Sequence, residues 1–177
     1  HDWDMFVDRA LSHLQTLGCR RPALVANVGQ NAGRVNIIRE GVQERGTELR
    51  DYWYHGVASN APDCAANVAE VLMRLPRRDR PDSLIVLDDN LLPDVTRGLE
   101  RAGQTASSVV PLVAHCNFPW PTASSLPTTR LGFRADAALE LCIDLILRQR
   151  RGEHVKEIRL LPALFDHEVE PALEEPK

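Results

Sequence analysis

The sequence predicts an α/β domain in which a parallel sheet is flanked by helices. Short runs of consecutive apolar residues, typical of strands buried on both faces, alternate with longer segments of helical periodicity. The clearest run is Ser83-Leu84-Ile85-Val86-Leu87, which is followed by the acidic pair Asp88-Asp89. Strands separated by helices of this length are joined by right-handed crossovers, and such crossovers produce a parallel sheet.

The first half of the chain is expected to alternate helix and strand. Apolar residues at three- and four-residue steps predict a helix over 5–17, which Gly18 ends. An apolar strand is expected at 23–27, and a helix from about 33 to 45 follows it. A second strand is expected around 52–54.

The second half begins with a helix opened by residues 60–63. The later expected elements are the strand at 83–87, a helix reaching Gly103, a strand at 109–114, an irregular proline-marked connection from His115 to Thr129, a helix from Arg134 to Gln149, a strand at 158–161 and an acidic tail. The helix at 134–149 has an apolar stripe, so we expect it to pack on its own lobe or on a second copy of the chain.

The amino-acid composition of the chain argues against several classes of function. The chain has 177 residues, a net charge of −4 and a hydrophobic fraction of 44%, which fits one large domain or two small subdomains and argues against a broad nucleic-acid-binding surface. Four cysteines without pair spacing indicate reduced thiols in a cytoplasmic protein rather than a metal site. Apolar runs fall short of the roughly 20 residues of a membrane helix. No cofactor is expected.

Six segments, in the correct order, resemble the effector-binding domain of the LacI/GalR family of transcriptional regulators. The segments are 14–21, the start of the helix that contains Arg34, 81–89, 110–113, 127–129 and 162–164. In the first segment, Cys19 stands where the family usually has histidine. In the second, Ile37-Ile38 replaces the family's glycine and aromatic residue. The resemblance implies a two-lobed, periplasmic-binding-protein-like domain of type I that closes on a small molecule.

By that resemblance the chain is mostly one lobe. Residues 1–126 would form most of the C-terminal lobe, 127–155 a crossover and a helix belonging to the N-terminal lobe, and 156–177 a return strand and acidic tail. The remaining N-terminal lobe and the DNA-reading helix-turn-helix would precede His1, so operator DNA is expected to be contacted only through a domain absent from this chain.

Candidate ligand-binding residues follow the expected strands, because ligands of doubly wound sheets bind beyond the carboxyl ends of the strands. The candidates are Arg34, Asp88, Gln30, His115, Cys116 and Asn31. Arg34 matches a family position that reaches the ligand, and its guanidinium suits hydroxyls or anions. Gln30 and Asn31 are alternatively turn residues or a helix cap. Asp88 is favoured as a ligand contact and Asp89 as the structural carboxylate.

Two departures from the family bear on the effector. The family commonly has aspartate at Cys116, and cysteine accepts hydrogen bonds poorly. Residues 57–60, where an aromatic often stacks on the sugar, contain none. These departures argue against an ordinary monosaccharide, although His115 could replace one contact; its alternative is a packed histidine.

The leading hypothesis is a ligand-sensing and dimerisation segment of a LacI/GalR-type regulator that binds a sugar or related polar metabolite. Leu91, Leu92, Val95 and Leu99 are the expected homodimer interface, with packing on the sheet as the alternative. No G-x-S-x-G, G-x-G-x-x-G or Walker motif favours an enzyme. The other hypotheses are a periplasmic sugar-binding protein of a transporter and a ligand-free dimerising scaffold.

Overall fold

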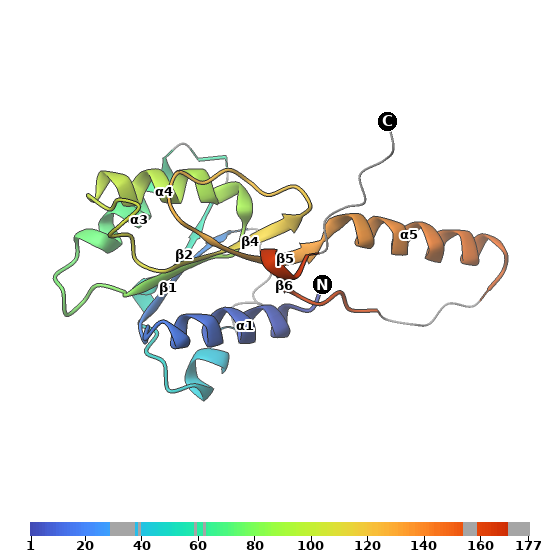
Figure 1. Ribbon diagram of the computed structural model, residues 1–177, viewed down its shortest axis with the longest axis horizontal. Coiled ribbons are helices and arrows are strands. Elements are labelled where there is room, and N and C mark those ends of the chain that lie inside the picture. Colours follow the sequence, from blue (N-terminus) through green and yellow to red (C-terminus); the bar gives the residue numbers. More distant parts are fainter. Residues whose placement is uncertain (29–37, 39, 59, 62, 154–158, 170–177) are drawn as a thin grey trace.

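The computed structural model describes residues 1–28, 38, 40–58, 60–61, 63–153 and 159–169, and these form one six-stranded sheet with helices on both faces (Figure 1). The strand order is β2-β1-β3-β4-β5-β6. The first five strands run parallel and β6 pairs antiparallel with β5. The predicted fold class is confirmed.

The elements are bounded as follows: α1 Trp3–Thr16, β1 Pro22–Asn27, the 3-10 turn η1 Asp51–Trp53, β2 Tyr54–Val57, α3 Cys64–Arg74, β3 Ser83–Val86, η2 Asp89–Leu91, α4 Leu92–Arg101, β4 Leu112–Phe118, β5 Thr129–Arg134, α5 Ala135–Arg150, β6 Leu164–Phe165 and η3 Asp166–Glu168. Residues 38 and 40–44 are also helical.

The sheet separates two hydrophobic cores, because successive side chains of a strand point to opposite faces. On the α1 side, Leu24 and Ala26 of β1 pack with α1 and with Phe133 of β5. On the other side, Ala23 and Val25 pack with α3 and α4. Figure 1 shows α1 on one face of the sheet and the α3–α4 pair on the other.

Several predicted boundaries are wrong. Residues 51–53 form η1, and the strand follows it at Tyr54–Val57. Residues 115–118 continue β4, where the sequence predicted an irregular connection, and the strand β5 at 129–134 was not predicted. Because β5 pairs with β4 over six residues, the start of the 127–155 segment belongs to this sheet. Residues 159–161 are not a strand, whereas Leu164 and Phe165 form β6.

The apolar face of α4 is part of the core. Leu91, Leu92, Val95 and Leu99 are each 0–2% exposed and pack with β-strand and α3 side chains. This corrects the predicted dimer interface: the alternative interpretation, packing on the sheet, describes all four residues. Gly98 permits the close α3–α4 contact, since a Cβ there would lie 2.1 Å from the carbonyl oxygen of Ala66.

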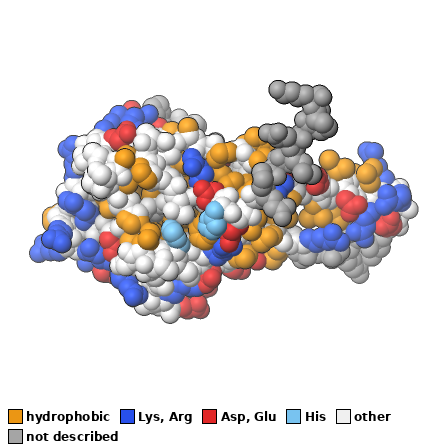
Figure 2. All heavy atoms as spheres, viewed as in Figure 1, with side chains coloured by type: hydrophobic (Ala, Val, Ile, Leu, Met, Phe, Trp, Pro, Cys, Tyr) orange, Lys and Arg blue, Asp and Glu red, His pale blue; other side chains and the backbone are white. Residues whose placement is uncertain are grey.

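Helix α5 projects away from the sheet (Figure 1), and none of its 16 residues is buried by the described part of the chain. The exposed fractions are 59% for Leu139, 58% for Ile143, 51% for Ile146 and 47% for Leu147. Figure 2 shows hydrophobic side chains among charged ones along this projection. The described part of the chain therefore contradicts the predicted packing of this helix on its own lobe, and its packing on a second copy of the chain stays a prediction.

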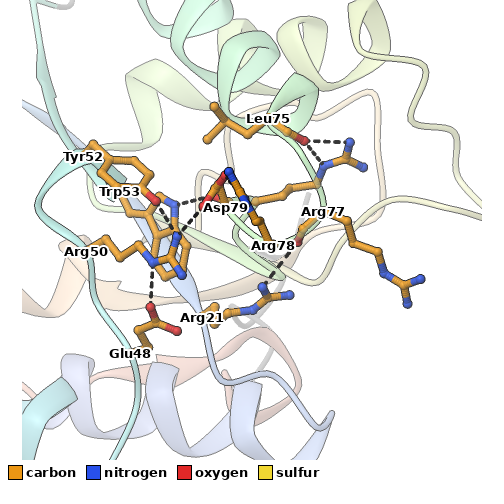
Figure 3. Close-up of polar contacts among 10 residues, drawn as sticks. Arg21, Glu48, Arg50, Tyr52, Trp53, Leu75, Arg77, Arg78 and Asp79 are labelled. Carbon is orange, nitrogen blue, oxygen red and sulfur yellow. Dashed lines mark hydrogen bonds and ion pairs between the residues drawn. The ribbon is translucent and has the colours of Figure 1, made fainter.

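At the amino-terminal edge of the sheet, the side chain of Arg50 contacts residues of three segments (Figure 3). Its guanidinium lies 2.6 Å from the Glu48 carboxylate, 2.9 Å from that of Asp79 and 4.9 Å from the centre of the Trp53 ring. Trp53, which is fully buried, donates its indole N–H to the Asp79 carbonyl at 3.0 Å. The charged and aromatic groups at this edge thus satisfy one another and fix the loop before β3.

Candidate ligand-binding site

The opposite, carboxyl-terminal edge of the sheet contains a cavity of about 250 Å³. Three parts of the chain form it: the start of α1, the turn from β3 into η2, and the end of β4. The described residues that line it are His1, Trp3, Leu87, Asp88, Asp89, Asn90, His115 and Asn117. This is the edge at which parallel α/β sheets bind ligands.

The helix cap of α1 places Trp3 in this wall. Asp2 is the N-cap residue, and its carboxylate accepts a hydrogen bond from the Met5 N–H at 2.9 Å. The cap satisfies a free N–H of the first turn. The aromatic side chain that follows it then lies over β4, with its ring centre 5.3 Å from that of His115.

Asp88 organises the turn after β3. One carboxylate oxygen accepts from the backbone N–H of Asn90 at 3.0 Å and from its side-chain amide at 2.9 Å. The other oxygen accepts from the side-chain amide of Asn27 at 3.0 Å. Asp88 therefore caps η2, which is the structural role that the sequence suggested for Asp89, and it also lines the cavity.

Asp89 is the more buried carboxylate, at 8% exposed. It accepts hydrogen bonds from the Asn117 amide at 2.9 Å and the Thr122 hydroxyl at 3.4 Å, and one oxygen lies 3.8 Å from His115 Nδ1. These partners, His115 first, hold the pKa of Asp89 below its ordinary value although burial acts in the opposite direction. Asp89 is therefore an ionised group held rigidly in the cavity wall.

His115 lies within an aromatic cluster. Its ring is stacked on Trp3 at an interplanar angle of 26° and lies 5.8 Å from the Phe133 ring, centre to centre. Nδ1 faces Asp89, whereas Nε2 is buried and has no hydrogen-bond partner among the described residues. A buried polar atom without a partner is unusual in folded proteins.

The remaining predicted residues divide into two groups. Cys116 is 1% exposed and does not line the cavity among the described residues; burial raises the pKa of its thiol to about 11, so the thiol is neutral and unreactive at neutral pH. Gln30, Asn31 and Arg34 lie outside the described residues.

Sequence reasoning missed Trp3, His1 and Asn117 as wall residues. Asn117 directly follows the predicted residues His115 and Cys116, and its polar side chain after a strand was a usable signal. Trp3 carries no comparable signal, because an aromatic residue in the first turn of a helix is usually core. Only the packing of α1 across β4 brings it to the cavity.

The cavity wall is rich in hydrogen-bond acceptors and contains no nucleophile–base pair among the described residues. In the described ranges, no group of three or more His, Cys, Asp or Glu side chains lies close enough to hold a metal ion. No helix in the described part of the molecule is long and apolar enough to cross a membrane.

Residues 11–165 match the family described as the periplasmic binding protein-like domain. The chain belongs to this family. Its fold is similar to that of a LacI family transcriptional regulator from Bifidobacterium animalis subsp. lactis, with a TM-score of 0.79 at 19% identity. The fold is also similar to that of a LacI family regulatory protein from Chloroflexus aggregans, with a TM-score of 0.79 at 17% identity. Both comparisons cover 93% of this chain and 59% of the other.

Two further relatives extend the comparison. A LacI family regulator from Lactobacillus casei with bound sucrose has a TM-score of 0.72 and 18% identity, covering 93% of this chain and 62% of that one. An uncharacterised oxidoreductase from Synechocystis is 30% identical over 107 residues, which are 60% of this chain and 28% of that protein. The chain thus spans about three fifths of the length of the regulators and a smaller share of the length of the oxidoreductase.

Proposed function

We propose that this chain is the larger part of the effector-sensing domain of a LacI-type transcriptional regulator, and that it binds a small sugar-like molecule at the carboxyl-terminal edge of its sheet. The observation that carries the proposal is the cavity between the start of α1, η2 and β4. Its fixed Asp88 and Asp89 and the amides of Asn90 and Asn117 offer the acceptors and donors that a polyol requires.

The relatives support this ligand class. Structures of the Lactobacillus casei regulator contain glucose, sucrose or Tris, all of which are small polyols. The oxidoreductase name belongs to a relative that shares only 28% of its length with this chain, so that name gives no support for catalysis here.

The exposed face of α5 supports a second lobe. Its large apolar side chains are about half exposed, and leaving such side chains in water forfeits roughly 1.5–3 kcal/mol each. We propose that α5 packs on an N-terminal lobe, which would form the other wall of an interlobe cleft. Ligand binding would then favour one arrangement of the lobes, and that arrangement would set the spacing of DNA-reading domains in a homodimer.

The cytoplasm is the proposed compartment. All four cysteines are free thiols, and Cys142 is exposed. Free thiols are better tolerated in a reducing compartment than in the periplasm. This favours the regulator over the solute-binding protein of a transporter, which has the same fold.

The test is a titration of the isotopically labelled chain with glucose and sucrose, followed by NMR. We expect shifts confined to residues 87–90 and 115–117, and weak affinity because one lobe supplies only part of a cleft. Asn117→Ala should abolish the shifts at 115–117. The matched control, Asn67→Ala, removes an exposed amide from α3 and should leave them unchanged. Shifts elsewhere, or none, would contradict the proposal.

A further inference from the structure

The Asp89 carboxylate connects the cavity to the loop between β4 and β5, residues 119–128. Asp89 lines the cavity, and its Oδ2 atom accepts hydrogen bonds from the Asn117 amide and from the Thr122 hydroxyl. Asn117 is also a wall residue, whereas Thr122 belongs to the loop and is not among the described lining residues. One oxygen atom of the cavity wall is therefore bonded both to the wall and to the loop.

The contact between Asp89 and Thr122 is the weaker of the two bonds at this atom. A carboxylate oxygen accepts about two hydrogen bonds, so Asn117 and Thr122 together fill the capacity of Oδ2. The bond from Asn117 is 2.9 Å long, whereas the bond from Thr122 is 3.4 Å long and exceeds the usual range of about 2.5–3.0 Å for a hydroxyl donor. A ligand hydroxyl that donates to Oδ2 therefore displaces the Thr122 hydroxyl first.

The loop keeps its other attachments when this bond is lost. The backbone carbonyl of Thr122 accepts a hydrogen bond from the Arg130 guanidinium at 3.1 Å. Farther along the loop, the Ser124 hydroxyl donates to the Leu126 carbonyl at 2.6 Å, and the Leu126 side chain is buried in the core beside α3 and α4. Because these contacts remain, loss of the Asp89 contact shifts the first half of the loop and does not unfold it.

Trp120 lies in this first half of the loop, at the surface of the molecule. Its side chain is 62% exposed, and it precedes Thr122 by two residues. Its backbone N–H donates to the Asn117 carbonyl at 2.9 Å, so the turn that carries Trp120 begins at a cavity residue. A change at Thr122 therefore alters the position of a large exposed aromatic side chain.

We propose that the contact between Asp89 and Thr122 is sensitive to the ligand: a polyol in the cavity displaces the Thr122 hydroxyl from Asp89, and the part of the loop that carries Trp120 shifts. The inference rests on the proposed function, because the ligand is the one proposed for the same cavity. The change is a population shift in which the ligand favours the loop without the Asp89 contact. Occupancy of the cavity thereby changes the outer surface of the lobe.

The test uses the NMR titration with glucose and sucrose and adds the side-chain indole signals. The chain has three tryptophans, whose indole N–H signals are assigned by replacing each in turn with phenylalanine. The proposed function alone expects shifts confined to the cavity segments, and the inference adds Trp120 as a further position. We expect the Trp120 signal to follow the same binding curve as residues 115–117, and the signal of buried Trp53, at the opposite edge of the sheet, to stay unchanged (Figure 3).

Thr122→Val removes the hydroxyl and keeps the shape of the side chain. In the ligand-free chain it should move the Trp120 signal toward its sugar-saturated position, and the remaining response to sugar should fall by at least about threefold. Sugar binding should become about two- to fivefold tighter, because the ligand no longer competes with Thr122. Loss of a residue that only supports the cavity would weaken binding instead.

Two controls accompany this variant. Thr122→Ser retains the hydroxyl and should behave as the wild type in both measurements. Thr105→Val removes a hydroxyl that bonds to Ser107 and Ser108 in the segment before β4, at the opposite edge of the sheet, and should change neither the Trp120 signal nor the affinity.

The outcomes separate the inference from the proposed function. Shifts at 115–117 without movement of the Trp120 signal overturn the inference and leave the proposed function standing. A Thr122→Val variant that binds sugar more weakly, or that retains the full Trp120 response, also overturns the inference. If neither 115–117 nor Trp120 responds to either sugar, the proposed function fails together with the inference. Movement of Trp120 alone would place the sugar at the loop and would refute both.

Discussion

Helices α4 and α5 both carry large apolar side chains, in a strongly amphipathic pattern in α4 and a weakly amphipathic one in α5, but the described chain covers only those of α4. Five of the ten residues of α4 are buried, whereas none of the 16 residues of α5 is buried by the described part of the molecule. Helix α4 lies against α3 and the sheet, and α5 begins after β5 and projects from the lobe (Figure 1). An amphipathic pattern thus indicates that a helix face requires a covering surface, but it does not say which surface supplies it.

The largest expected difference between the two helices is in how a leucine-to-alanine substitution changes the free energy of unfolding. Leu99→Ala in α4 removes a fully buried side chain, and we expect a loss of about 2–5 kcal/mol in the free energy of unfolding. Leu139→Ala in α5 removes a side chain that is 59% exposed, and the change should stay within about 0.5 kcal/mol. Urea denaturation measures both. Equal losses would show that α5 is covered in solution.

The next largest effect tests the contact between α3 and α4. Alanine is favoured over glycine in an exposed helix by roughly 1 kcal/mol. Gly98→Ala should nevertheless destabilise the protein by about 1–3 kcal/mol, because the added Cβ would lie 2.1 Å from the Ala66 carbonyl oxygen. Thermal unfolding reports the change. The control is Glu100→Ala on the exposed side of α4. A Gly98→Ala variant that is more stable than wild type would mean that α3 and α4 are not in contact.

A smaller effect contrasts a buried carboxylate in the lobe with a partly exposed one in α5. The pKa of Asp89 lies below its ordinary value, so ionised Asp89 stabilises the fold above that ordinary value, and the contribution is lost as pH falls through the lowered pKa. Asp89→Asn should therefore cost about 1–2 kcal/mol near neutral pH, and the difference from wild type should shrink below about pH 4.

Asp136 at the start of α5 is the matched comparison. Arg134 lowers its pKa as well, but the pair is partly exposed to solvent. Asp136→Asn should change stability by less than about 0.5 kcal/mol. Denaturation at several pH values measures both variants, and an Asp89→Asn penalty that grows on acidification would contradict the assignment.

The smallest thermodynamic effect is expected on the exposed face of α5. Leu139→Glu with Ile143→Glu should leave the free energy of unfolding of this chain within about 0.5 kcal/mol, while lowering its self-association in sedimentation velocity, since an exposed apolar patch promotes association. In a longer protein whose second lobe covers α5, the same pair should destabilise strongly. Destabilisation of the 177-residue chain itself would show that its own lobe covers the helix.

Two strands show why the fold was only partly predictable. Strand β3 is a continuous apolar run buried on both faces, so its composition identified it. Strand β5 contains two arginines and Gly132, and its sequence resembles a loop. The glycine is needed because a Cβ there would lie 1.8 Å from the Cys116 carbonyl oxygen. That requirement exists only once β4 and β5 are paired.

The candidate site was predictable to a similar extent. The turn after β3 and His115 were identified as ligand-binding candidates, because the carboxyl ends of parallel strands meet at the same edge of a sheet. The roles of Asp88 and Asp89 were not, since which of the two carboxylates caps η2 depends on the position of Asn27 and Asn117. Trp3 was not identified, because its distance in sequence from β4 gives no indication of contact.

By itself the sequence determined the alternation of helices and strands, the parallel sheet, and the family resemblance, because periodicity and the order of local motifs are properties of neighbouring residues. The tertiary structure decided what lies next to each apolar face and each strand end. It buried the predicted interface of α4, left α5 exposed, and placed Trp3, Asp89 and His115 around one cavity. Those outcomes depend on contacts between residues distant in sequence, and a local pattern does not encode them.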